Sequence, residues 1–376
     1  MTEAKRLRLA IPEKKKCAAD FLNDACWLKI FKHLHLEDLL ATARVNKKFK
    51  NVSMTSFKER FGYFSYPYTP WNDLWDQRTR NYMDEIDMRK VLLNFGHLIK
   101  SMCLRDRGLI YVVEMDIVSK YCAGTLEELN VLGLNAPFCD DLVKPLFESL
   151  KVLEIYGEYF YEAIKACKCL NVLRIVVHEN CGFDEMNKNI PTLKELHISC
   201  SEKTPAQNQY IKLLLQSNSQ IKKLSLNDCN VNETLCIVAP EMLHLEELRI
   251  SRRFRIAYRG NLDNIIELGK LSSLKRLEFN CIHGDAVRAI VEAMQNVPLE
   301  HFKWARCPSN LEFMESILKL KTLKSLALTG IISPIGKFQK LAAQLPLLEE
   351  FEFEIIDDET REMRDMLHRL SIFGQL

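Results

Sequence analysis

The chain has 376 residues, of which 27% are charged and 47% hydrophobic, and its formal net charge is only +2. This composition is typical of a folded protein with ample apolar material for a core, and the small net charge gives no reason to expect a nucleic-acid partner. No apolar run approaches the roughly 18 residues of a membrane span, so we expect no membrane partner. The thirteen cysteines follow no fixed spacing and the chain opens with charge instead of a signal peptide, so we expect reduced thiols and a cytoplasmic or nuclear location.

Residues 1–19 form the first segment and are dominated by basic side chains. The segment contains two acidic residues, Glu3 and Glu13, and six basic ones: Lys5, Arg6, Arg8, Lys14, Lys15 and Lys16. Because such charge runs usually stay solvated, we expect a basic disordered tail.

Residues 20–61 show apolar side chains at helical spacing in three short groups. The groups are Leu22, Cys26, Trp27, Ile30, Phe31 and Leu34, then Leu36, Leu39, Leu40 and Ala43, and finally Phe49, Val52, Phe57 and Phe61. Three helices in about 40 residues bury too little surface to be stable alone. Either the module packs on the rest of the chain as a cap, or a partner covers its apolar face.

The run LNDACWLKIFKHL at 22–34, with LEDLL at 36–40 and VNKKF at 45–49, resembles the three segments of an F-box. In that family the module docks on a Skp-family adaptor, which links to a cullin scaffold in an SCF-type ubiquitin ligase. The resemblance implies adaptor contacts from Leu22, Ile30, Leu34, Leu39, Leu40, Val45, Lys48 and Phe49. The chain departs from the family pattern at four positions, where Asn23 replaces a proline, Ala25 an acid, Asn46 a cysteine and Phe49 a tryptophan. These departures bear on adaptor affinity more than on the fold.

Residues 62–98 lie between the module and the repeats that follow. Residues 63–75 are rich in aromatic side chains and include Pro67 and Pro70. A segment this apolar differs from a flexible Gly/Ser linker, so we expect an ordered linker that fixes the two parts relative to each other.

Residues 99–376 repeat one pattern: an apolar residue, two variable residues, an apolar residue, one variable residue and another apolar residue. The copies start at Ile99, Leu126, Leu150, Leu170, Leu193, Ile221, Leu245, Leu274, Leu299, Leu323 and Leu348. The spacing of these starts lies within the range of leucine-rich repeats. The last two apolar positions share one face of a strand, and segments such as 285–295 have helical periodicity. The sequence therefore predicts the α/β class, with a leucine-rich-repeat solenoid whose parallel sheet is concave, preceded by a small all-α F-box-like module.

The array also resembles the cysteine-containing leucine-rich repeats that are common beside F-boxes. The cysteine expected after the strand occurs only as Cys229 and Cys307, which we interpret as small buried residues at the turn.

The sequence contains no phosphate-cradling glycine motif, serine-nucleophile elbow or paired-histidine zinc motif. Cys167 and Cys169 have no second pair that would complete a zinc site. We therefore expect no catalytic residue, no metal and no cofactor, and we look for binding surfaces instead.

Two surfaces could bind a protein target. One is the set of outward strand positions, which are mixed in charge: Glu154, Tyr156, Arg174, Glu195, His197, Lys223, Asn227, Glu247, Arg249, Arg276, Glu278, His301, Lys303, Glu350, Glu352 and Glu354. The other is an insertion in the longest repeat, whose candidate contacts are Arg252, Arg253, Phe254, Arg255 and Tyr258. Arginine and aromatic residues are enriched in binding hot spots, although a solvated loop would have the same composition.

These features lead to one hypothesis and one alternative. The first is a non-catalytic substrate-recognition subunit of an SCF-type ligase, with an adaptor on the F-box and a protein substrate on the repeats. The alternative is a non-ligase leucine-rich-repeat scaffold or inhibitor whose amino-terminal helices are only a cap. An enzyme is disfavoured because no nucleophile and base occur together in a recognisable motif.

Overall fold

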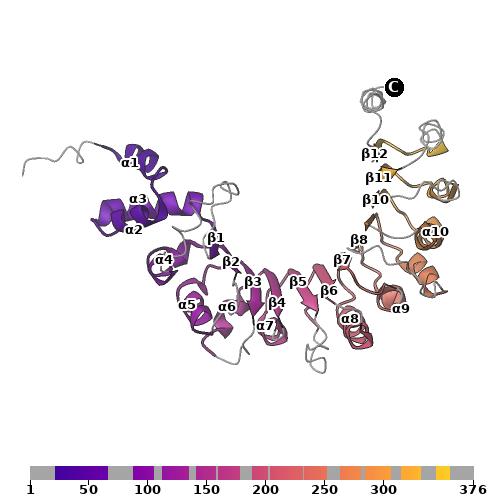
Figure 1. Ribbon diagram of the computed structural model, residues 1–376, viewed down its shortest axis with the longest axis horizontal. Coiled ribbons are helices and arrows are strands. Elements are labelled where there is room, and N and C mark those ends of the chain that lie inside the picture. The colour runs from indigo at the N-terminus through magenta and orange to yellow at the C-terminus, as the bar shows by residue number, and fades with distance from the viewer. Residues whose placement is uncertain are drawn as a thin grey trace, which may run out of the picture.

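The computed structural model describes residues 22–66, 88–105, 112–134, 141–157, 160–177, 189–201, 204–231, 233–251, 263–280, 284–305, 315–331 and 344–355. Within these ranges the chain forms three amino-terminal helices followed by a curved solenoid with strands on its inner side and helices on its outer side (Figure 1). None of the helices in these ranges combines the length and apolar content that a membrane span requires.

The amino-terminal module consists of α1 (Asp24–Phe31), α2 (Leu36–Thr42) and α3 (Lys47–Arg60). Two asparagines start two of these helices. The side chain of Asn23 accepts a hydrogen bond from the Cys26 amide at 2.9 Å, and that of Asn46 accepts one from the Phe49 amide at 2.8 Å. Asparagine is among the best N-cap residues because its side chain satisfies an amide that the first turn leaves free. Two of the departures from the F-box pattern therefore serve as helix caps.

All strands lie in one parallel sheet, and their order in space is their order in the chain, from β1 to β12. The strands are β1 (Tyr63–Tyr66), β2 (Ser101–Arg105), β3 (Glu128–Leu134), β4 (Val152–Gly157), β5 (Val172–Val177), β6 (Glu195–Cys200), β7 (Lys223–Asn227), β8 (Glu247–Ser251), β9 (Arg276–Asn280), β10 (His301–Ala305), β11 (Ser325–Ile331) and β12 (Glu350–Ile355). Each predicted repeat supplies one of β2 to β12, so the parallel solenoid is confirmed.

Helical segments connect the strands and cover the outer side of the curve (Figure 1). They are α4 (Met88–Phe95), η3 (Gly96–Leu98), α5 (Val112–Cys122), α6 (Lys144–Glu148), α7 (Phe160–Ala166), α8 (Pro205–Ser217), α9 (Leu235–Val238), η5 (Ala239–Glu241), η6 (Asp263–Lys270), α10 (Gly284–Ala293) and η7 (Met294–Asn296). The helix predicted at 285–295 is thus α10 continued by η7. Because strands are closer together than the helices behind them, the sheet curves inward and forms the concave face.

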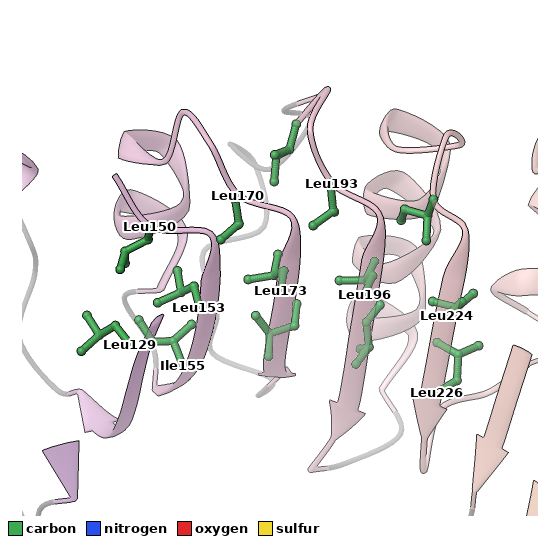
Figure 2. Close-up of a cluster of buried hydrophobic side chains, with 14 of the residues drawn as sticks. Leu129, Leu150, Leu153, Ile155, Leu170, Leu173, Leu193, Leu196, Leu224 and Leu226 are labelled. Carbon is green, nitrogen blue, oxygen red and sulfur yellow. The ribbon is translucent and has the colours of Figure 1, made fainter. Parts of the chain in front are cut away.

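The core lies between the sheet and the outer helices. Equivalent leucines of successive strands, among them Leu129, Leu153, Leu173 and Leu196, are fully buried and stack along the solenoid (Figure 2). The strand register aligns them directly, with Leu129 opposite Leu153 and Leu173 opposite Leu196. Each repeat therefore buries its apolar side chains against its neighbours, which explains why the pattern recurs at nearly constant spacing.

One strand lies outside the predicted repeat. The segment expected to be an ordered linker contains β1, which pairs with β2 and places Phe64 opposite Met102. Phe64 is 1% exposed and belongs to the same core as the repeats. Residues 67–87 of the same linker lie outside the described residues. The sheet therefore begins one strand earlier than the repeat pattern indicates.

The residues immediately before β2 to β12 form a row of mostly alternating charge, which we call the edge row. It consists of Lys100, Glu127, Lys151, Asn171, Lys194, Lys222, Glu246, Lys275, Glu300, Lys324 and Glu349. Each member after Lys100 donates its backbone N–H to the carbonyl of the preceding member, as Glu127 does to Lys100 at 2.8 Å. Side chains also pair along the row, with Lys151 Nζ 2.9 Å from Glu127 Oε2. Backbone and side chains thus link successive repeats at the same edge.

Candidate functional site

The outer surface of the amino-terminal module carries several of the predicted adaptor contacts. Ile30 is 44% exposed and Val45 is 62% exposed, while Leu22, Leu34 and Phe49 are partly buried. Ile30 and Val45 are the exposed large apolar side chains among the described residues of the module. These residues form the part of the module that a partner could cover.

Two other predicted contacts belong to the interior. Leu39 is fully buried and Leu40 is only 7% exposed. Both lie on α2, which packs on α3 and on α4 of the solenoid. The chain itself covers both side chains in this structure, and their contact with an adaptor stays a prediction.

Lys48 is exposed but has partners within the module. Its Nζ donates to the Leu22 carbonyl at 2.9 Å and lies 3.5 Å from a carboxylate oxygen of Asp24. Lys48 therefore joins the start of α3 to the start of α1. Of the eight predicted adaptor residues, it is the one whose internal role is electrostatic.

Trp27 and Cys26 also belong to this surface, although they are absent from the predicted contacts. The Trp27 ring packs against Phe49 and Phe31 with centroid distances of 4.7 and 5.8 Å. Cys26 is exposed and lies four residues before Ile30 on α1, so the two share one face of that helix. The same helical spacing could have identified Cys26 from the sequence.

A second set of contacts fixes α1 against α3. Arg60 Nη1 donates to the carbonyl of Phe31, the last residue of α1, at 3.2 Å and to that of Leu34, three residues later, at 2.7 Å. Lys32 Nζ lies 2.7 Å from Glu59 Oε2. The outer surface is therefore held on a rigid module.

The concave face is the second candidate surface, and its charges are divided between strands. On β4 to β6, Arg174 lies between Glu154 and Glu195, at 4.0 and 3.7 Å, and His197 Nε2 lies 2.6 Å from Glu195. On β8 and β9, Arg249 and Arg276 both approach Glu278, at 3.2 and 3.6 Å. The first group thus gathers carboxylates around one arginine, while the second gathers arginines around one carboxylate.

The predicted arginine insertion cannot be placed on this face. Arg252, Arg253, Phe254, Arg255 and Tyr258 lie outside the described residues, and β8 ends just before them at Ser251. Glu354 and Cys307 likewise lie outside the residues whose side chains are described.

The cysteines that the structure describes have different environments. Cys229 is half-buried, with its Sγ 3.1 Å from that of Cys200. The hydrogen bond from Cys200 and the burial of the thiol raise the pKa of Cys229 well above its ordinary value. Cys167 is buried and Cys169 is exposed. In the described ranges no three histidine, cysteine or acidic side chains lie close enough together to hold a metal ion.

Comparison with known proteins identifies the amino-terminal module. Residues 20–60 match the family model of the F-box domain. No curated protein matches the chain significantly.

Several solved structures are similar to the chain at low identity. An internalin from Listeria monocytogenes is 14% identical with a TM-score of 0.32, and the match covers 73% of both chains. The leucine-rich-repeat-containing protein LegL7 from Legionella pneumophila is 14% identical with a TM-score of 0.47, covering 76% of this chain and 95% of that one. A leucine-rich-repeat protein from Leptospira interrogans is 15% identical with a TM-score of 0.28, covering 69% and 80%.

The fold assignment follows from the strand order and the repeat spacing of the chain itself. The chain therefore carries an F-box domain at residues 20–60, followed by a solenoid of leucine-rich repeats.

Proposed function

We propose that this chain is the substrate-recognition subunit of an SCF-type ubiquitin ligase. Its F-box would bind a Skp-family adaptor, which joins a cullin scaffold, and its repeats would hold a target protein. The chain itself would catalyse nothing. It would act by proximity, because tethering a target raises the effective concentration of its lysines at the reactive thioester.

The observation that carries this proposal is the exposed apolar surface of the F-box module. On the inner side of the module Leu39 of α2 is fully buried, and α2 packs on α4 of the solenoid. Ile30 and Val45 remain 44% and 62% exposed on the outer side. A module needed only to seal the first repeat would gain solubility from polar residues at these two positions.

The alternative function, a binding scaffold with a helical cap, is favoured by a different contact. Phe57 of α3 stacks on Phe95 of α4 with a centroid distance of 4.4 Å, so the module does cover the first helix of the solenoid. Capping and docking use opposite sides of the module. The two functions are therefore distinguished by adaptor binding and not by the cap contact.

Co-expression with a Skp-family adaptor tests the proposal. We expect a stable one-to-one complex from the wild-type chain, and its loss in the Ile30→Asp/Leu34→Asp variant, because a partner would then bury unpaired charge. Leu93→Asp is the matched control, since Leu93 is 62% exposed on α4, outside the F-box. A wild-type chain that stays monomeric with micromolar adaptor would favour the scaffold.

A further inference from the structure

The outward positions of β7 to β10 carry more positive than negative charge. We call them the basic patch, and their ionised side chains are Lys223, Glu247, Arg249, Arg276, Glu278 and Lys303. The four cations and two carboxylates leave a surplus of positive charge on four adjacent strands. The cations are open to solvent, with side-chain exposures of 50% for Arg249 and 40% for Arg276.

The pairing within the patch leaves its centre incompletely neutralised. Lys223 pairs with Glu247 at 3.0 Å. Glu278 is shared by both arginines, so one carboxylate serves two guanidinium groups. Lys303 is exposed on the next strand and forms no ion pair with any side chain in the described ranges. Arginine forks with unused donors favour additional carboxylate ligands.

Carboxylates on the neighbouring strands limit the length of the patch. Toward the amino terminus, Glu154 and Glu195 lie on either side of Arg174 on β4 to β6, and Glu128 lies on β3. Toward the carboxyl terminus, Glu350 and Glu352 are exposed on β12. An acidic ligand longer than the patch would meet like charges at both ends, which disfavours extended polyanions such as nucleic acid.

The spacing of the strands indicates how such a ligand would lie. Neighbouring strands are about 4.8 Å apart, so the patch spans about 14 Å from β7 to β10. Side chains on one face of an extended peptide recur every two residues, about 6.7 Å. Three carboxylates at alternate positions would therefore cover the patch when the peptide crosses the strands. Ser225 on β7 and Ala327 on β11 lie in the same row as Arg249 and Lys303 and are small enough to let a peptide backbone approach.

We propose that the basic patch binds an extended acidic segment of the target protein, with carboxylates at alternate positions. The proposal rests on the proposed function in that the segment belongs to the protein held for ubiquitin transfer. Binding of the segment itself requires no adaptor, so the two can be tested separately.

Fluorescence anisotropy with the full chain and a labelled decapeptide of alternating serine and glutamate tests the site. An exposed ion pair changes affinity by a factor of about 1.5 to 5, so we expect Arg249→Ser/Arg276→Ser/Lys303→Ser to weaken binding about tenfold. The matched control removes three exposed lysines from the helical side, Lys144→Ser/Lys168→Ser/Lys319→Ser, and should stay within about twofold of wild type. Binding should also weaken as salt rises.

Two single substitutions keep the test independent of folding. Glu278→Gln removes the competing carboxylate and should tighten binding about threefold, which a damaged fold could not do. Lys303→Glu breaks no ion pair seen in the described ranges and should weaken binding several-fold.

The proposal is overturned if the patch and control triples bind alike, or if Glu278→Gln fails to tighten binding. Tighter binding of a single-stranded oligonucleotide than of the peptide would also overturn it. Peptide binding by a chain that forms no adaptor complex would remove the ligase assignment and support the site. An adaptor complex without peptide binding would support the ligase assignment and rule out the peptide site.

Discussion

Phe57 and Phe95 stack with their ring planes 16° apart, although they belong to the F-box and to the first helix of the solenoid. Both side chains are fully buried. Together with the β1–β2 pairing, this contact makes the F-box part of the solenoid core. An adaptor bound to the outer side of the module would therefore be connected rigidly to the repeats.

The stacking contact leads to the first prediction. Phe95→Ala should lower the free energy of unfolding by about 3–5 kcal/mol, because it leaves a cavity between α3 and α4. Leu93→Ala on the exposed side of the same helix should change it by less than about 0.5 kcal/mol. Urea unfolding followed by circular dichroism measures both. Equal effects of the two substitutions would mean that the aromatic contact does not form.

The second prediction concerns the strand register. Leu277→Ala and Leu326→Ala should each cost about 2–5 kcal/mol, because both side chains are fully buried on inward positions of β9 and β11. Lys303→Ala, on an outward position of β10, should lie within about 0.5 kcal/mol of wild type. Comparable losses at all three positions in urea unfolding would show that the register is wrong.

The third prediction concerns thiol reactivity. Burial raises the pKa of Cys122 to about 12, and burial together with the Glu267 charge raises that of Cys236 to about 12. At pH 8 only about one part in ten thousand of each is thiolate, so neither should react with iodoacetamide in the folded chain. The exposed thiols of Cys26 and Cys169 should react.

The same labelling reports on the adaptor surface. Because Cys26 shares a face of α1 with Ile30, bound adaptor should protect Cys26 and leave Cys169 reactive. Peptide mass spectrometry with and without adaptor measures this difference. Cys26 that labels at the same rate in the complex would place the adaptor elsewhere on the module.

The fourth prediction concerns acid stability. A hydrogen bond from Lys151 and the charge of that lysine lower the pKa of Glu127 below its ordinary value of 4.5. Hydrogen bonds from Lys222 and Lys324 lower the pKa of Glu246 and Glu300 in the same way. Their stabilisation is present above about pH 4.5 and is lost as pH falls through the lower pKa values of the folded state.

A triple Glu→Gln variant at these positions should therefore lose stability at pH 6 but show less further loss between pH 5 and pH 3 than wild type. Urea midpoints across this range measure the effect. Parallel curves for the two proteins would contradict a contribution of the edge row to acid sensitivity.

Much of the fold could be predicted because every repeat places its apolar residues in the same buried environment, so the same short pattern recurs in the sequence. A leucine that must be buried in every repeat, such as Leu153 or Leu224, leaves a periodic trace in the sequence. β1 carries a weaker form of this trace: Phe61, Phe64 and Tyr66 have the repeat spacing, and Phe61 and Phe64 are buried, but aromatic residues stand where the other repeats have mostly aliphatic ones.

The candidate sites were less predictable for two physical reasons. Helical spacing shows that Leu39 and Ile30 lie on apolar faces, but not that only the first is buried within the chain. The sharing of Glu278 by Arg249 and Arg276 depends on the register between strands whose residues are far apart in the sequence. Side-chain charge is visible in the sequence, whereas its neutralisation is not.

The alternating charge of the edge row affects the electrostatic cost of adding or deleting a repeat. Deleting only the repeat that carries Glu300 would set Lys275 beside Lys324, two like charges on adjacent strands. Deleting the Lys324 repeat as well would set Lys275 beside Glu349 and restore an attractive neighbour. In this part of the molecule, repeats are therefore gained or lost with less electrostatic cost in pairs than singly.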